Sequence, residues 1–150
     1  MPFTYDRYIY FDISHALEVH QYIIDVTGGL AGIQNQGLLE SVLANIQNDE
    51  YYPSFTKKLT HLVHSVIKLH SFNDGNKRSS IALGIYFLLL NDPDYCSLEF
   101  ERSMENIVVW VAEGKIDKVL LEDLIDSILY QRDYSEELKW RLYKAISIDS

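Results

Sequence analysis

The segment His70-Ser71-Phe72-Asn73-Asp74-Gly75-Asn76-Lys77-Arg78 separates two stretches that have helical hydrophobic patterns. Before it, apolar residues from Leu59 onward recur at i, i+3, i+4, i+7 and i+8, which predicts an amphipathic helix with one buried stripe. After it, residues 76–90 are apolar on almost every side, which predicts a central helix enclosed by its neighbours. We therefore expect the 70–78 segment to form a loop that leads directly into the first turn of a buried helix.

The remainder of the chain has a helical pattern as well. Further helices are predicted at residues 13–24, 42–46, 104–112, 119–129 and 136–146. Gly28-Gly29 should stop the first of them, and Asn91-Asp92-Pro93-Asp94 should end the central helix. Only Tyr8-Ile9-Tyr10-Phe11 is a possible strand. Because no repeat or linker interrupts the pattern, residues 1–150 are predicted to form a single all-α domain.

Composition excludes several classes of protein. With 47% hydrophobic and 23% charged residues, the 150-residue chain resembles an ordinary globular domain. Its one cysteine, Cys96, rules out an internal disulfide, a zinc ribbon and a CxxC redox motif. The longest apolar run, residues 81–90, is shorter than a membrane span, and the first residues lack an apolar signal region. We expect a cytoplasmic protein without membrane contact.

The charge is unevenly distributed. A net charge of −9 argues against direct nucleic-acid binding, because phosphate backbones would be repelled. Between residues 57 and 78, however, one acid stands against five bases, which are Lys57, Lys58, Lys68, Lys77 and Arg78. This positive island would suit a compact polyanion such as a nucleotide; alternatively, its first three lysines form a solvated helix face.

A glycine-rich loop is predicted between the first two helices. The stretch Gly28-Gly29-Leu30-Ala31-Gly32-Ile33-Gln34-Asn35-Gln36-Gly37 holds four of the seven glycines. It could be a plain connection between helices or a flap over a cleft, because loops of this length often carry function.

The start of the central helix has the features of an anion site. The first N–H groups of a helix lack internal partners and carry about half a positive charge. Gly75 permits close approach of a ligand, and Asn76 adds an amide. Lys77 and Arg78 would each cost about 0.3–1 kcal/mol at this position unless an anion is bound. The pattern therefore predicts a phosphate site.

Two neighbouring residues have alternative interpretations. Asp74 could cap the helix, or it could hold Mg²⁺ against phosphate oxygens. His70 ends a buried stripe and could be a core histidine, but its place four residues before Asp74 suits a general base. Phe72, between these residues, is expected to enter the core and fix the loop.

The pattern His70-x-Phe72-x-Asp74-Gly75-Asn76-Lys77-Arg78 closely resembles the motif HxFx(D/E)GN(G/K)R of the Fic/Doc (Fido) family. The stretch Gly28-Gly29-Leu30-x-Gly32-Ile33, followed by Gly37-Leu38-Leu39-Glu40-Ser41, is similar to the flap region of its death-on-curing (Doc) branch. The resemblance covers about residues 12–91 and implies a Fic/Doc-like helical bundle with a glycine-rich flap.

The resemblance also implies an activity. It is that of a toxin-like transferase that uses ATP or another nucleotide, with Mg²⁺, to modify a Ser, Thr or Tyr hydroxyl of a target protein. The flap would align the target by strand-like main-chain pairing. By the same resemblance, His70 is the catalytic base, Asp74 is the metal ligand, and Gly75, Asn76, Lys77 and Arg78 bind the nucleotide.

Two departures from the AMP-transferring pattern concern the transferred group. Such members usually have glycine where Lys77 stands and a second arginine where Ile81 stands. The Doc branch combines the same change with a reversed nucleotide, so we expect phosphoryl transfer, with AMP transfer as the alternative. Since no (S/T)xxxE(G/N) inhibitory helix is evident, restraint is expected from a separate antitoxin protein.

Two other interpretations of the function are open, a zinc site and a non-catalytic binding module. His61 and His64 share one helix face and could belong to a zinc site, but no HExxH motif is present, which favours solvated histidines. His15 and His20 have no evident partners in the sequence. A non-catalytic binding module is the second interpretation, although it leaves the joint presence of His70 and Asp74 unexplained.

Overall fold

The computed structural model describes residues 7–147, which form an all-α fold, as predicted. The helices are α1 (Ile13–Thr27), α2 (Gln36–Asn45), α3 (Phe55–Lys68), α4 (Asn76–Asn91), α5 (Leu98–Ala112), α6 (Lys118–Tyr130) and α7 (Glu136–Ser147). Among the described residues, extended pairing is limited to one isolated bridge between Ile33 and Phe72. No helix within this range combines the length and the apolar character needed to cross a bilayer.

Local sequence explains where several helices begin. Asp12, Asn35, Ser54 and Asp117 each precede a helix, and each side chain accepts a hydrogen bond from the backbone N–H three residues on. Such N-caps typically contribute about 1 kcal/mol each. Gly28, with φ of 87°, follows the last residue of α1, so the predicted stop is confirmed.

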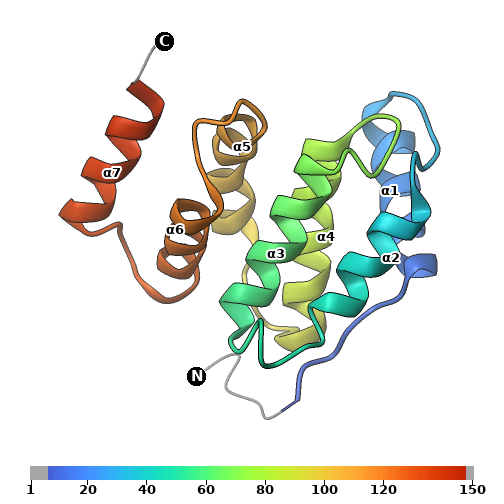
Figure 1. Ribbon diagram of the computed structural model, residues 1–150, viewed down its shortest axis with the longest axis horizontal. Helices are drawn as coiled ribbons and strands as arrows, with labels where there is room; N and C mark the ends of the chain where they lie inside the picture. The colour runs from blue at the N-terminus through green and yellow to red at the C-terminus, as the bar shows by residue number, and fades with distance from the viewer. Residues whose placement is uncertain (1–6, 148–150) are drawn as a thin grey trace.

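The helices are arranged around a central pair. Figure 1 shows α3 and α4 side by side, with α1 and α2 on one side, α5 and α6 on the other, and α7 outermost against α6. α4 packs against α1, α3 and α5, which confirms a central enclosed helix. α3 is buried over more of its surface than its single predicted stripe, because polar residues such as Thr56 and Ser65 are buried with the apolar ones.

The prediction of a possible strand at residues 8–11 is wrong. The segment is extended, but it pairs with a side chain instead of another strand. Asn91, at the end of α4, accepts a hydrogen bond from the Ile9 N–H at 2.7 Å and donates one to the Ile9 carbonyl at 3.0 Å. One asparagine thus satisfies both backbone polar groups of Ile9, which a neighbouring strand could otherwise have paired.

The predicted positive island is wrong for two of its five bases. Lys58 is fully buried, and its Nζ donates to the Ile46 carbonyl and to Asp49, both at 2.7 Å. Lys57 pairs with Glu122 at 2.8 Å. The solvated-face alternative fails for Lys58 as well, because a buried lysine with two oxygen partners serves the packing of the fold.

Candidate functional site

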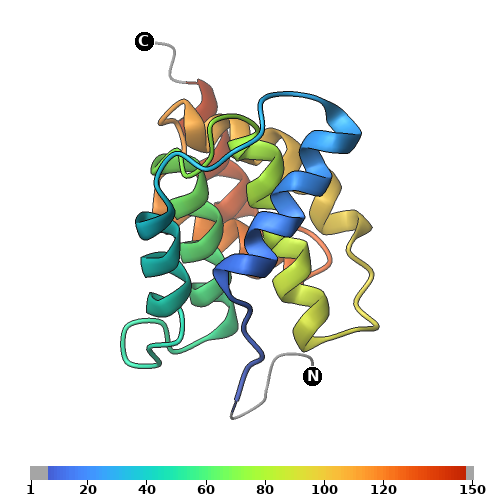
Figure 2. The same ribbon diagram turned by 90° about the vertical axis from the view of Figure 1, so that its right-hand side faces the viewer.

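The glycine-rich loop lies against the loop between α3 and α4. Ile33 pairs with Phe72 in the antiparallel bridge, and the Gln34 N–H donates to the Ser71 carbonyl at 2.8 Å. Figure 2 shows both loops at the same end of the bundle. Two segments distant in the sequence are therefore joined by strand-like backbone pairing at the start of α4.

Close approach of the two loops depends on Gly29. A Cβ atom at this position would lie 2.5 Å from Asp74 Oδ2 and 3.3 Å from Arg78 Nη2. No side chain can occupy that space unless Asp74 moves. The backbone of the glycine-rich loop thus lies directly on two of the predicted site residues.

The N-terminus of α4 is open to a ligand. Gly75 precedes it with φ of 73°, in the left-handed region, and no side chain caps the helix here. A cleft of about 140 Å³ lies at this point. Five predicted site residues line it, namely His70, Asp74, Gly75, Asn76 and Lys77.

His70 is exposed, so the core-histidine interpretation is wrong. Its φ of 46° makes it the non-glycine residue with a positive φ among residues 7–147. Left-handed backbone is costly outside glycine and persists where the surroundings impose it, often at functional sites. This conformation places the imidazole at the cleft, where a ligand can reach it.

The Asp74 carboxylate is held by two backbone groups. It accepts hydrogen bonds from the Leu30 N–H at 3.1 Å and from the Gly75 N–H at 2.8 Å. These bonds, with the Leu30 bond as the larger cause, lower the pKa of Asp74, so the group is charged at neutral pH. The proposed cap to the N–H groups two or three residues on is not formed, because α4 has no side-chain cap.

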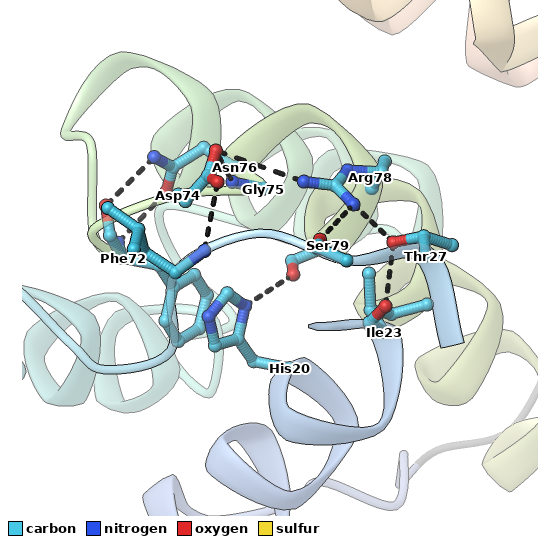
Figure 3. A network of polar contacts seen from close by, with 11 residues as sticks. His20, Ile23, Thr27, Phe72, Asp74, Gly75, Asn76, Arg78 and Ser79 are labelled. Atoms are coloured by element: carbon cyan, nitrogen blue, oxygen red, sulfur yellow. Dashed lines mark hydrogen bonds and ion pairs between the residues drawn. The ribbon is translucent and has the colours of Figure 1, made fainter. Parts of the chain in front are cut away.

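Arg78 is directed at the end of α1 instead of the cleft. Its Nη1 donates to Thr27 Oγ1 and, at 2.8 Å, to the Gly28 carbonyl, while Nη2 lies 3.8 Å from Asp74 Oδ1 (Figure 3). The Thr27 hydroxyl donates in turn to the Ile23 carbonyl at 2.7 Å. A cation is favourable at a helix C-terminus, where carbonyl groups lack partners. Arg78 therefore contacts Asp74 but does not line the cleft with the other five predicted site residues.

The Asn76 side chain holds the loop. Its Oδ1 accepts from the Phe72 N–H and its Nδ2 donates to the Phe72 carbonyl, both at 2.9 Å. Phe72 is fully buried, as predicted. The amide expected to face an anion is thus engaged with the Phe72 backbone.

The model of the Fic/DOC family matches residues 10–88. The match covers more than half of the 150 residues and includes both loops of the site. The chain belongs to the Fic/DOC family. Membership supports nucleotide-dependent transfer in general, because this is generally a family of transferases. No curated protein matches the chain.

His20 is a residue of this Fic/DOC site that the sequence reasoning missed. It lies on α1, is 2% exposed, and its Nδ1 is 2.7 Å from Ser79 Oγ. Its ring stacks on Phe72 with the centroids 3.7 Å apart. Both partners are more than fifty residues away, so only its place on the buried face of α1 could have indicated a role. His15 has a partner too, Asp12 at 2.7 Å.

The zinc interpretation gains no support. His61 is half-buried, Lys118 Nζ lies 2.8 Å from its Nδ1, and Tyr52 Oη lies 3.4 Å from its Nε2. Burial, with Lys118 and His64 nearby, lowers the pKa of His61 to about 4. Within residues 7–147, no three His, Cys, Asp or Glu side chains gather as metal ligands. The expectation of solvated histidines is also wrong, since both rings are half-buried.

Proposed function

We propose that the chain transfers the γ-phosphoryl group of ATP to a Ser, Thr or Tyr hydroxyl of a target protein, as expected for the Doc branch. One observation carries the proposal: His70, Asp74 and Lys77 meet in one cleft at the uncapped start of α4. A base, an anionic metal ligand and a cation beside free helical N–H groups are what phosphoryl transfer requires.

Asp74 is suited to hold Mg²⁺. Mg²⁺ usually binds one or two carboxylates and takes its other ligands from phosphates and water. Asp74 is the carboxylate of the cleft, is charged, and is exposed enough to reach a ligand. Bound Mg²⁺ would neutralise charge on the phosphate chain. The Asn76 N–H and the Lys77 ammonium would hold the phosphate oxygens, while the Gly75 N–H holds Asp74 in place.

His70 would act on the target hydroxyl. Its imidazole accepts the hydroxyl proton while the hydroxyl oxygen forms a bond to the γ-phosphorus. The bond from that phosphorus to the bridging oxygen breaks, and ADP leaves with the electron pair. The proton on His70 then passes to solvent. A base positioned in this way typically contributes 10²–10⁴-fold in rate.

Nucleotide binding would displace the glycine-rich loop. The Leu30 N–H occupies Asp74 Oδ2, and Arg78 is held by Thr27 and Gly28. We propose that Arg78 leaves the end of α1 for the phosphate chain, and that the loop leaves Asp74 at the same time. The loop would then be a flap, free to align a target segment by main-chain pairing.

Lys77 and Ile81 favour phosphoryl transfer over AMP transfer. Lys77 fills the space that glycine leaves open in AMP-transferring members. Ile81 is half-buried against the core, so position 81 supplies no cation where AMP-transferring members usually have a second arginine. The placement of Ile81 supports a binding mode in which the γ-phosphate of the nucleotide, and not its α-phosphate, lies beside Lys77.

Parallel labelling tests this proposal. A cell lysate is incubated with the protein and either γ-³²P-ATP or α-³²P-ATP, with the His70→Ala variant as the matched control. We expect added label from γ-³²P-ATP only, above the background that the lysate's own kinases give with the His70→Ala control. Label from α-³²P-ATP would show AMP transfer instead, and Lys77→Gly combined with Ile81→Arg should move the wild type toward that outcome.

A non-catalytic binding module is the second candidate. The observation that favours it is the small cleft, since about 140 Å³ is below the roughly 300–1,000 Å³ of typical ligand pockets. Titration with Mg²⁺ and an ATP analogue separates the two functions, because the module would bind neither.

We also propose that a separate antitoxin protein restrains the transferase. Without the antitoxin, the activity would be unchecked in the cell.

A further inference from the structure

His20 forms the support under the catalytic loop. Its ring lies parallel to the Phe72 ring, with an interplanar angle of 5° and the centroids 3.7 Å apart. Its Nδ1 lies 2.7 Å from Ser79 Oγ, on the first turn of α4. Figure 3 shows His20 between Phe72 and Ser79, so one imidazole contacts both the loop and the helix that follows it.

The position of Phe72 determines the shape of this loop. Phe72 lies two residues after His70 and two before Asp74, and its ring is fully buried. Both of its backbone polar groups bond to the Asn76 side chain. Because the backbone of Phe72 is fixed to α4, a tilt of its ring would be transmitted to the residues on either side.

Stability alone does not explain a histidine at this position. The Nε2 atom of His20 is buried and has no hydrogen-bond partner among the described residues. A buried nitrogen without a partner is destabilising. Burial, together with the nearby Arg78 charge, lowers the pKa of His20, so the ring is neutral. A phenylalanine at this position with an alanine at position 79 would keep the stacked ring and leave no buried polar atom without a partner.

We propose that His20 is a positioning residue: its bond to Ser79 sets the rotation of the imidazole, and the imidazole sets the position of Phe72 and thereby of His70. The inference rests on the proposed function for the role of His70. A displacement of about 1 Å can cost a reacting group about 10²-fold in rate. His20 thus contributes to catalysis without contacting the substrate.

Two matched variants remove the same bond from opposite sides. His20→Phe keeps the stack and loses Nδ1, and Ser79→Ala loses the hydroxyl. We expect each to lower kcat for phosphoryl transfer about 10-fold, with the KM for ATP changed less than about 3-fold. The double variant should lose no more than either single one, because both act through one bond. His15→Phe, on the exposed side of α1, is the control and should keep the wild-type rate.

Thermal melting separates positioning from packing. The double variant His20→Phe/Ser79→Ala should have a Tm equal to or above that of the wild type, because it removes the unpartnered nitrogen and leaves no buried hydroxyl without a partner. A fall in kcat accompanied by a matching fall in Tm would show a packing role and overturn the proposal. Wild-type kcat in both His20→Phe and Ser79→Ala would overturn it as well.

Hydrogen exchange gives a measurement that needs no activity. Amides of residues 70–75 should exchange about 10-fold faster in His20→Phe and Ser79→Ala than in the wild type or in His15→Phe. If the wild type transfers no label from any nucleotide, the proposed function fails, and this comparison still decides whether His20 positions the loop. Unchanged exchange in both variants would refute that role.

Discussion

Replacing Gly29 by alanine should raise the affinity for nucleotide. In the docked loop, the added Cβ would lie 2.5 Å from Asp74 Oδ2, and Asp74 is held there by two backbone N–H groups. This clash is relieved when the glycine-rich loop moves away and the Leu30–Asp74 contact breaks. We expect Gly29→Ala to favour the undocked loop, which leaves Asp74 and Arg78 available to Mg²⁺ and phosphate.

The size of the expected gain in affinity follows from the steric overlap between the added Cβ and Asp74. Overpacking of this kind costs about 1–3 kcal/mol, and a tenfold change in an equilibrium corresponds to about 1.4 kcal/mol. The docking equilibrium should therefore move by about 5- to 140-fold. The apparent Kd can improve by no more than this factor, because nucleotide binding gains at most the free energy by which the docked loop is destabilised.

Gly28→Ala is the matched control. Gly28 also has a positive φ, 87°, but its added Cβ would meet no atom within 4 Å. Both variants carry backbone strain, whereas only Gly29→Ala displaces Asp74. Calorimetric titration of each with Mg²⁺ and a non-hydrolysable ATP analogue measures the Kd. Equal affinities in the two variants, or weaker binding in Gly29→Ala, would refute competition between the loop and the nucleotide.

Removing the Asp74 charge with Asp74→Asn should weaken nucleotide binding in Mg²⁺ much more than in EDTA; an equal loss in both titrations would argue against a metal ligand. Asn76→Ala removes both bonds to Phe72 and should lower the free energy of unfolding by about 1–3 kcal/mol in urea titration. His61 has a folded pKa of about 4 against an ordinary 6.5, so the unfolded chain takes up the proton first as the pH falls. The free energy of unfolding should therefore fall from about pH 6.5 to 4, and His61→Gln should flatten this slope in melts across that range.

Helices were predictable because their signals are local. The apolar periodicity of residues 59–70 and 76–90 located α3 and α4, and Gly28 marked the end of α1. The strand at residues 8–11 was not excluded, because the partner that makes it unnecessary, Asn91, lies 82 residues away. Lys58 was predicted to be exposed for a similar reason, since its burial depends on Asp49 and the Ile46 carbonyl.

The site was predictable where its chemistry is contiguous. Six residues of the 70–78 segment line one cleft because the loop and the first turn of α4 follow each other in the chain. The position of Arg78 could not be deduced, because its partners Thr27 and Gly28 come from α1. The exposure of His70 depends on a left-handed φ, which no hydrophobic pattern encodes.

The junction of α1 with α4 has a consequence for how the protein is made. Contacts from Asp74 to Leu30, Arg78 to Gly28 and His20 to Ser79 span 44, 50 and 59 residues. Contacts of such separation form late, because chain closure costs entropy before they are gained. On the ribosome, α1 emerges before α4; it can pack against α2 early, but it lacks its main partner until α4 has been synthesised. The nascent chain consequently has no assembled cleft until then, and translation itself delays the assembly of the cleft.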